Sequence, residues 1–290
     1  MAHRAVEPFM PANRNRADEE TFHRCLSGIV TDLLGGQPVI TSLHRNRSKY
    51  SSWYAAEILT VRVAAGAELK IFMKDFGSYF RAKDGMEQRR DREMRVYKEL
   101  LAQADLGTAR YYGSVVDASR GRFWLLLEYV DGMPVRYCDL KYWIAAAGWL
   151  GRMHGHFARQ SSRLSATCFL VRHDIAFFLS KADLALAAVS HISPALARRL
   201  SALLNGYDRL AEVMASGPHT LVHGAYRAKE ILVSAGSDPP RICPVDWELA
   251  AFGAPLYDLA QLTDGFKPAM LDRFWNAYRE QANACDLALP

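Results

Sequence analysis

The 290-residue sequence has few cysteines, and none of them are paired at metal-ligand spacing. The five cysteines are Cys25, Cys138, Cys168, Cys243 and Cys285. With no Cys-x-x-Cys pair, the pattern does not predict a zinc ribbon or a thioredoxin-like redox motif. An odd and scattered set is also atypical of a disulfide framework, so reduced thiols are expected.

The sequence also lacks a recognisable targeting or membrane segment. Residues 1–20 are polar and charged and have no apolar centre, so they are not expected to form a signal peptide. No apolar run approaches the length that crosses a bilayer, and the most apolar segment, 123–130, has the length of a strand. We therefore expect a cytoplasmic protein that does not contact a membrane.

A strong excess of charge of one sign is missing as well. The formal net charge is +5, and half of the residues are hydrophobic, which is typical of a globular protein. The densest basic run, 83–95, also contains four acids, so it is interpreted as a solvated helix face and not as a nucleic-acid surface.

What the sequence does contain is a strand-rich half followed by a helical half. Helical spacing predicts helices at 19–34, 85–103 and 143–159, two more in 160–216 with a break near 190–194, and the terminal helices in 256–287. Apolar runs between turn residues predict strands at 39–45, 53–64, 68–75, 111–116 and 123–130. The predicted class is α+β. We expect a flexible arm at 1–20, a β-rich lobe at 21–131 and a helical lobe at 132–290.

One stretch, 221–258, organises the chain. A loop opened by His223-Gly224 runs into an apolar strand at 231–233, a polar turn follows, and a second apolar strand ends on Asp246. Two short strands that present a loop and a carboxylate side by side are what a metal-phosphate site requires.

This pattern resembles the catalytic and metal-binding loops of the aminoglycoside phosphotransferase and choline kinase family, which are distant relatives of protein kinases. The resemblance implies a two-lobed protein-kinase-like fold, with a small antiparallel β-sheet in the N-terminal lobe and a mostly helical C-terminal lobe. It also implies ATP and Mg²⁺ as cofactors. The family writes the loop as His-Gly-Asp, four residues, Asn, and later Asp-Trp-Glu. Here Ala225 occupies the base position and Glu230 occupies the Asn position, while Asp246-Trp-Glu is present.

The resemblance assigns further roles by position. Lys74, at the end of the third strand, would hold the nucleotide phosphates, and Glu93 would orient that lysine. Glu128 and Val130 would lie in the hinge that binds adenine through its backbone. Asp246 would bind the metal, and Asp258 would brace the catalytic loop.

The nucleotide side departs from the family pattern in two places. No Gly-rich phosphate loop follows the first strand; basic and hydroxyl residues in 45–52 take its place, either to hold phosphate through side chains or to form an exposed polar turn. Phe72 is bulky for a residue that lines the adenine side. The tripeptide Asp75-Phe-Gly77 copies a protein-kinase metal motif, but it precedes the catalytic loop and is interpreted as a chance match.

The substitutions in the loop leave two interpretations of activity open. The methyl group of Ala225 cannot accept a substrate proton, and loss of a general base costs about 10²- to 10⁴-fold in rate. Glu230 could still reach Mg²⁺ with one extra negative charge, or it could pair with Lys229 or Arg227 in a site that has lost its ions. His223 is expected to shape the loop.

The acceptor is predicted from the charge of residues 160–216. Six basic residues outnumber four acidic ones there, which favours a neutral, apolar or anionic acceptor over a polycationic aminoglycoside. The preferred function is an ATP- and Mg²⁺-dependent O-phosphotransferase for a small, non-polycationic molecule. The alternative is a catalytically silent, pseudokinase-like protein that binds a nucleotide or a small molecule and has a possible protein partner.

Overall fold

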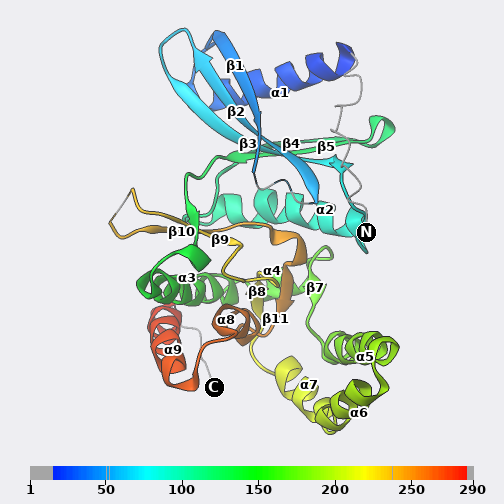
Figure 1. Cartoon of the computed structure of the whole chain (residues 1–290). Helices are drawn as coiled ribbons and strands as arrows, with labels where there is room; N and C mark the ends of the chain where they lie inside the picture. The colour runs from blue at the N-terminus through cyan, green and yellow to red at the C-terminus, as the bar shows by residue number, and fades with distance from the viewer. Residues whose placement is uncertain (1–15, 50, 52, 237, 286–290) are drawn as a thin grey trace, which may run out of the picture. The chain divides into compact units, whose positions relative to one another are not determined.

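A computed structural model describes residues 16–49, 51, 53–236 and 238–285 (Figure 1). Most of the predicted N-terminal arm, 1–15, lies outside these residues, and from Arg16 the chain is helical. Two compact units are present. The first is the chain up to Arg81 with Tyr112–Glu128, and the second is Ala82–Tyr111 with the chain from Tyr129 onward. The lobe boundary near residue 131 stays a prediction.

The first unit is built on a five-stranded sheet in the order β1-β2-β3-β5-β4. Its strands are β1 Ile40–Arg47, β2 Tyr54–Val63, β3 Glu68–Tyr79, β4 Tyr111–Asp117 and β5 Arg122–Glu128. The pairs β1–β2, β2–β3 and β3–β5 are antiparallel. The predicted strand meander is therefore present, with each strand within a few residues of its expected place.

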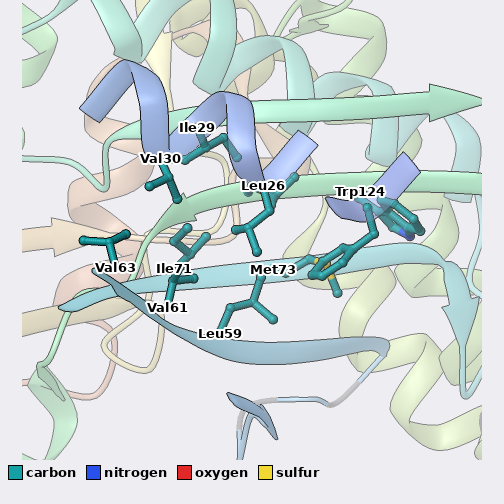
Figure 2. Close-up of a cluster of buried hydrophobic side chains, with 11 residues drawn as sticks. Leu26, Ile29, Val30, Leu59, Val61, Val63, Ile71, Met73 and Trp124 are labelled. Carbon is teal, nitrogen blue, oxygen red and sulfur yellow. The ribbon is translucent and has the colours of Figure 1, made fainter. Parts of the chain in front are cut away.

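Helix α1 (Arg16–Leu34) supplies four of the eleven buried residues in this unit's core cluster. Its buried residues Phe22, Leu26 and Ile29 recur at helical spacing and pack against side chains from one face of the sheet (Figure 2). The sheet contributes Leu59, Val61, Val63, Ile71, Met73, Trp124 and Leu126. Burial of each large aliphatic side chain contributes about 1.5–3 kcal/mol.

The second unit is mostly helical, as predicted. Helix α3 (Leu140–Ala158) packs along α9 (Pro268–Asn283), and α2 (Met86–Arg95) continues as a π-helical turn, Val96–Leu100. Glycines allow α3 to approach α9 closely: a Cβ built on Gly151 would lie 2.1 Å from the Tyr278 carbonyl oxygen. A larger residue at that position would force the two helices apart.

Two small three-stranded sheets hold the loops of the second unit. Their orders are β10-β9-β6 and β7-β11-β8. The strands are β6 Met133–Pro134, β7 Val171–Arg172, β8 Thr220–Val222, β9 Ile231–Ser234, β10 Arg241–Pro244 and β11 Ala251–Gly253. Strands β9 and β10 form the hairpin that the sequence predicts, with Ile231 opposite Pro244. Helix α8 (Leu256–Thr263) follows β11.

The prediction of two helices in 160–216 was wrong. Four are present: α4 Ser161–Ser165, α5 Ile175–Ile192, α6 Pro194–Leu203 and α7 Tyr207–Ser216. Two of them, α5 and α6, begin at side-chain caps: Asp174 accepts from the Phe177 amide and Ser193 accepts from the Leu196 amide.

The expectation that no segment has the length and composition of a membrane span also needs correction. Within the described residues, α5 is the one helix that passes this test, with a mean hydropathy of 1.5 and 6% of it buried. The segment that contains α5, α6 and α7 begins and ends at the same sheet. Strand β7 precedes it, β8 follows it, and both pair with β11. Helices α6 and α7 have 10 residues each, too few to cross back. The topology therefore favours α5 as a surface helix.

Candidate functional site

The loop after β8 is held by a buried carboxylate. Asp258, in the first turn of α8, is fully buried, and it accepts hydrogen bonds from the backbone amides of His223 (2.6 Å) and Gly224 (2.9 Å). Its Oδ2 also lies 3.4 Å from Nε2 of the buried His154. Asp258 therefore braces the loop, as the sequence predicts.

The ring of His223 joins the loop to the end of the neighbouring hairpin. Nε2 lies 3.0 Å from the Val245 carbonyl oxygen, which can only accept, so Nε2 carries the proton. Nδ1 is then free to accept the Ala225 amide at 3.3 Å. Burial lowers the pKa of His223, and the Asp258 carboxylate opposes this. Both ring nitrogens are thus engaged in holding the loop.

Gly224 is required by this geometry. Its φ is +78°, and a Cβ there would lie 2.1 Å from the Leu249 carbonyl oxygen. We expect Gly224→Ala to destabilise the protein by more than the about 1–2 kcal/mol that left-handed backbone alone costs a non-glycine residue. The matched control is Gly265→Ala, which has φ +86° and no atom within 4 Å. Thermal unfolding checks this, and equal losses in the two variants would contradict it.

The residue after Ala225 in the loop is the aromatic Tyr226. It is fully buried, its hydroxyl donates to the Ala146 carbonyl oxygen at 2.9 Å, and its ring stacks on Trp149 with centroids 6.0 Å apart. The loop is therefore anchored on α3, and Arg227 beside it is exposed. Local sequence patterns do not reveal this anchor.

Glu230 lies at the start of the β9–β10 hairpin. Its amide donates to the Arg227 carbonyl oxygen at 2.8 Å, and its own carbonyl accepts the Val245 amide at 2.8 Å. The carboxylate forms an ion pair with Lys229, whose Nζ lies 2.9 Å from Oε1. The predicted ion pair with Lys229 is therefore present, and metal binding by Glu230 stays a prediction.

Asp246 follows β10 and occupies an unusual backbone conformation. Its φ of 66° and ψ of 59° are left-handed, and no other non-glycine among the described residues has a positive φ. Such conformations are costly and occur preferentially at functional sites. The turn aims the chain from the hairpin into Trp247–Leu249, where Trp247 is fully buried.

Three carboxylates meet at this turn. Ligand oxygens of Glu93, Asp246 and Glu248 all lie within 4.8 Å of one another. Glu93 comes from α2 and is 2% exposed. The structure thus brings together two of the residues predicted for the site, Glu93 and Asp246. Hard oxygen donors at this spacing fit Mg²⁺.

The basic run 83–95 is not simply a solvated face, which corrects the interpretation drawn from the sequence. Lys83 and Arg89 both form ion pairs with Glu248, and the Arg92 guanidinium donates to the Glu248 carbonyl oxygen at 2.6 Å. These contacts bridge up to 165 positions along the chain, so local patterning could not reveal them.

The nucleotide-side residues predicted in the first unit occupy strands of its sheet. Lys74 lies in β3 opposite Ala56 and Leu125, and its ammonium group is 5.0 Å from the centroid of the Phe76 ring. Glu128 ends β5 opposite Ile71. Val130 follows in the second unit and is buried. The Asp75-Phe-Gly77 tripeptide is part of β3, which agrees with its interpretation as a chance match.

Several residues of the polar segment 45–52, which stands in place of a Gly-rich loop, contact residues of the same unit. The Ser51 hydroxyl bonds both to the carbonyl and to the amide of Ala56 at 3.0 Å, and Arg45 pairs with Glu57 at 2.6 Å. Arg47 lies 5.0 Å from the Phe80 ring centroid. Of the predicted phosphate-holding residues, Ser52 lies outside the described residues. The contacts that are described favour a structural turn.

A histidine between β7 and α5, His173, lies in an aromatic cluster. His173 is 2% exposed and stacks on Phe177 at 4.2 Å, with the Tyr257 ring centroid 4.6 Å away. Its Nδ1 has no hydrogen-bond partner in the described part of the chain. Burial lowers the pKa of His173 to about 4, opposed by Asp258 and reinforced by His219 and Lys181.

This cluster predicts a loss of stability in acid. The ordinary pKa of 6.5 applies to the unfolded chain and about 4 to the folded chain, so unfolding gains a proton in between. The contribution of His173 to the free energy of unfolding is fully present above about pH 6.5. It is lost as the pH falls toward 4, by about 3 kcal/mol in total. His173→Phe should flatten the dependence of the melting temperature on pH over this window, whereas His191→Phe, at an exposed position of α5, should not. Parallel curves for the parent and His173→Phe would contradict the assignment.

Comparison with known proteins places the chain in a family. Residues 69–287 match the phosphotransferase enzyme family (APH), and the chain belongs to this family. A search of curated proteins gave no match.

Solved structures of similar fold include antibiotic phosphotransferases. One is the macrolide 2'-phosphotransferase MphH from Brachybacterium faecium, as the apoenzyme, with 16% identity and a TM-score of 0.56 over 85% of this chain and 83% of that one. A second is wild-type aminoglycoside 2'-phosphotransferase-IIIa with GDP, at 14% identity and a TM-score of 0.54, covering 92% and 84%. A third is APH(3'')-Id from Streptomyces rimosus with ADP and streptomycin, at 17% identity and a TM-score of 0.51, covering 93% of each chain. At these identities the likeness shows the fold, and it confirms the predicted kinase-like phosphotransferase fold.

Proposed function

We propose that the protein is an ATP- and Mg²⁺-dependent O-phosphotransferase that acts on a small, non-polycationic molecule. The observation that carries the proposal is Asp246, held in a left-handed turn with the Glu93 carboxylate within 4.8 Å, in a chain of the phosphotransferase family. A strained acid beside a second buried acid is difficult to explain by folding alone.

The carboxylates at the turn are suited to a divalent cation, and membership of the phosphotransferase family supports a nucleotide as the second ligand. Asp246 would hold Mg²⁺ with Glu230 as the second candidate ligand, and the bound ion would offset negative charge on the phosphates. Glu230 can do so only by sharing its carboxylate with Lys229, which lies 2.9 Å away. Lys74 would contact the phosphates as a point charge, with Glu93 orienting it, and Glu128 and Val130 would bind adenine through the backbone.

The catalytic loop would position the acceptor without supplying a base. His223 and Gly224 shape the loop through Asp258, and Ala225 presents only a methyl group to the acceptor hydroxyl. Positioning and charge stabilisation remain, and these supply most of the catalysis in phosphoryl transfer. A slow enzyme is the expected consequence.

The surroundings of the loop favour an acceptor that is not a polycation. The rings of His173, Phe177 and Tyr257 lie together, and Tyr257 directly precedes Asp258, which braces the loop. Burial raises the pKa of Tyr257, Asp258 adds to the rise, and Arg227 opposes it, so a loop cation lies within electrostatic reach of this ring. Asp174 is already used to cap α5. Apolar rings and an arginine suit a neutral or anionic molecule.

The second candidate is a catalytically silent protein that binds a nucleotide or a small molecule and works with a protein partner. Two observations favour it: Ala225 has no acid, and Glu230 is paired with Lys229. In both cases we propose a cytoplasmic protein without a nucleic-acid or membrane partner.

The test is phosphate transfer from γ-labelled ATP, with Mg²⁺, to a panel of hydroxyl compounds that are neutral, anionic or polycationic. Labelled product from a neutral or anionic compound is the expected result. Transfer to the polycationic compounds alone would overturn the acceptor class. No transfer to any compound, with metal-dependent ATP binding intact, would establish the silent alternative.

A further inference from the structure

Helix α2 and the turn at Asp246 are joined by four residues, Lys83, Arg89, Arg92 and Glu248, which we call the α2 clasp. Lys83 pairs with Oε2 of Glu248, and Arg89 Nη1 lies 3.0 Å from Oε1. Arg92 donates to the Glu248 carbonyl oxygen at 2.6 Å and, through Nε, to the Phe169 carbonyl oxygen at 2.9 Å. Each polar atom of Glu248 beyond its amide therefore accepts from a cation on the α2 segment.

The clasp is shielded from water. The side chains of Glu248 and Lys83 are 9% and 10% exposed, and that of Arg89 is 27% exposed. Burial lowers the pKa of Arg92, with Arg89 adding to this and Glu248 opposing it, as expected for a guanidinium packed into the contact. Ion pairs at such depth are weakly screened, and loss of one partner leaves an unbalanced buried charge.

Glu248 lies close to the metal candidates but is not available to a metal. Its oxygens are within 4.8 Å of those of Glu93 and Asp246, yet both already accept from a cation. Bringing a divalent ion onto them would require Lys83 and Arg89 to leave. The geometry therefore sets Glu248, which faces the clasp, apart from Asp246, the candidate metal ligand, and Glu93, the candidate partner of Lys74.

The clasp also offsets repulsion at this turn. Three carboxylates this close would repel one another if they were unaccompanied. The three cations of the clasp match them in number and come from the same segment of chain as Glu93. The clasp therefore offsets negative charge on the residue two positions after Asp246.

We propose that Glu248 is a positioning residue: through the α2 clasp it presets Asp246 and Glu93 relative to each other before any ligand arrives. Helix α2 is then a fixed part of the site and does not move into place. The consequence for metal binding rests on the proposed function, whereas the presetting of the turn does not.

The experiment compares the parent with Glu248→Gln, which keeps the shape but removes the charge, and with Arg89→Gln, a milder change at a more exposed position. The matched control is Glu87→Gln, at an exposed acid on the same helix. Amide hydrogen exchange of the segment 245–250 is measured without ligand. We expect exchange of this segment to be faster in the two clasp variants than in the parent, and unchanged in the control. Unchanged exchange in both clasp variants would overturn the proposal, and Arg89→Gln decides if Glu248→Gln does not fold.

A second measurement separates positioning from simple anchoring of the helix. Mn²⁺ is titrated into each variant with ADP and followed by calorimetry. The account predicts that the clasp variants bind Mn²⁺ about 10- to 100-fold more weakly than the parent, as for other residues that orient metal ligands. Arg89→Lys, which keeps the positive charge, should bind Mn²⁺ as the parent does. Faster exchange with unchanged Mn²⁺ affinity would show a structural anchor only. A parent that binds no Mn²⁺ with ADP would refute the proposed function, and the exchange result would still decide the presetting.

Discussion

Replacing Ala225 by aspartate is expected to raise the rate of phosphoryl transfer by about 10²- to 10⁴-fold, the usual contribution of a positioned general base. The loop is already held for this role. Its amide at position 225 is bound by His223 Nδ1 at 3.3 Å, and the next residue, Tyr226, is fully buried against α3. The backbone that would carry the carboxylate is therefore fixed on both sides.

The gain is measured as labelled phosphate transferred to the best acceptor of the panel. Two controls separate a base from an added polar group or an added charge. In Ala225→Asn, the asparagine side chain has the same size as aspartate but cannot accept the proton. Ala228→Asp places a carboxylate three residues further along the same loop. Only Ala225→Asp should be faster than the parent. A variant that binds nucleotide as the parent does, yet transfers nothing, would show that the loop is silent for reasons other than the missing acid.

Asp246→Asn is expected to abolish metal-dependent nucleotide binding. Asparagine tolerates the left-handed backbone at φ 66°, so the turn should survive while the charge is lost. Loss of a direct ligand should exceed the about 10- to 100-fold that an outer partner of a metal ligand costs.

The measurement is Mn²⁺ affinity in the presence of ADP, with Asp264→Asn, at an exposed position after α8, as the control. Unfolding curves of the variant and the parent should coincide, which would place the effect at the site. Parent-like Mn²⁺ affinity in Asp246→Asn would remove this residue from the metal site and leave its strained conformation without an explanation.

Most of the fold could be predicted from local patterns. Residues 22, 26, 29 and 30 recur at helical spacing, and α1 buries these positions against the sheet. Alternation and turn residues were enough for β1, β2 and β3. The segment 160–216 was harder, because α5 is largely apolar although only 6% of it is buried. Its apolar residues therefore do not indicate which face packs inward.

The site was predictable where it is local and not where it is tertiary. The hairpin, Asp246 and the brace by Asp258 follow from one stretch of sequence. The partners of Glu248 lie 156 to 165 residues away, and the same charges that form the clasp are typical of a solvated helix when they are seen alone. Tyr226 is similar, because its hydrogen bond to Ala146 spans 80 positions. Charge pairing and burial between distant segments leave no period in the sequence.

The central claim is that this chain holds a nucleotide through a metal ion, and a calorimetric titration of the parent protein with ATP tests it most directly. The titration is run with Mg²⁺ and again with a chelator. The account predicts saturable binding with Mg²⁺ that disappears in the chelator. No binding at millimolar ATP with Mg²⁺ present, or binding that is the same in both, would contradict it.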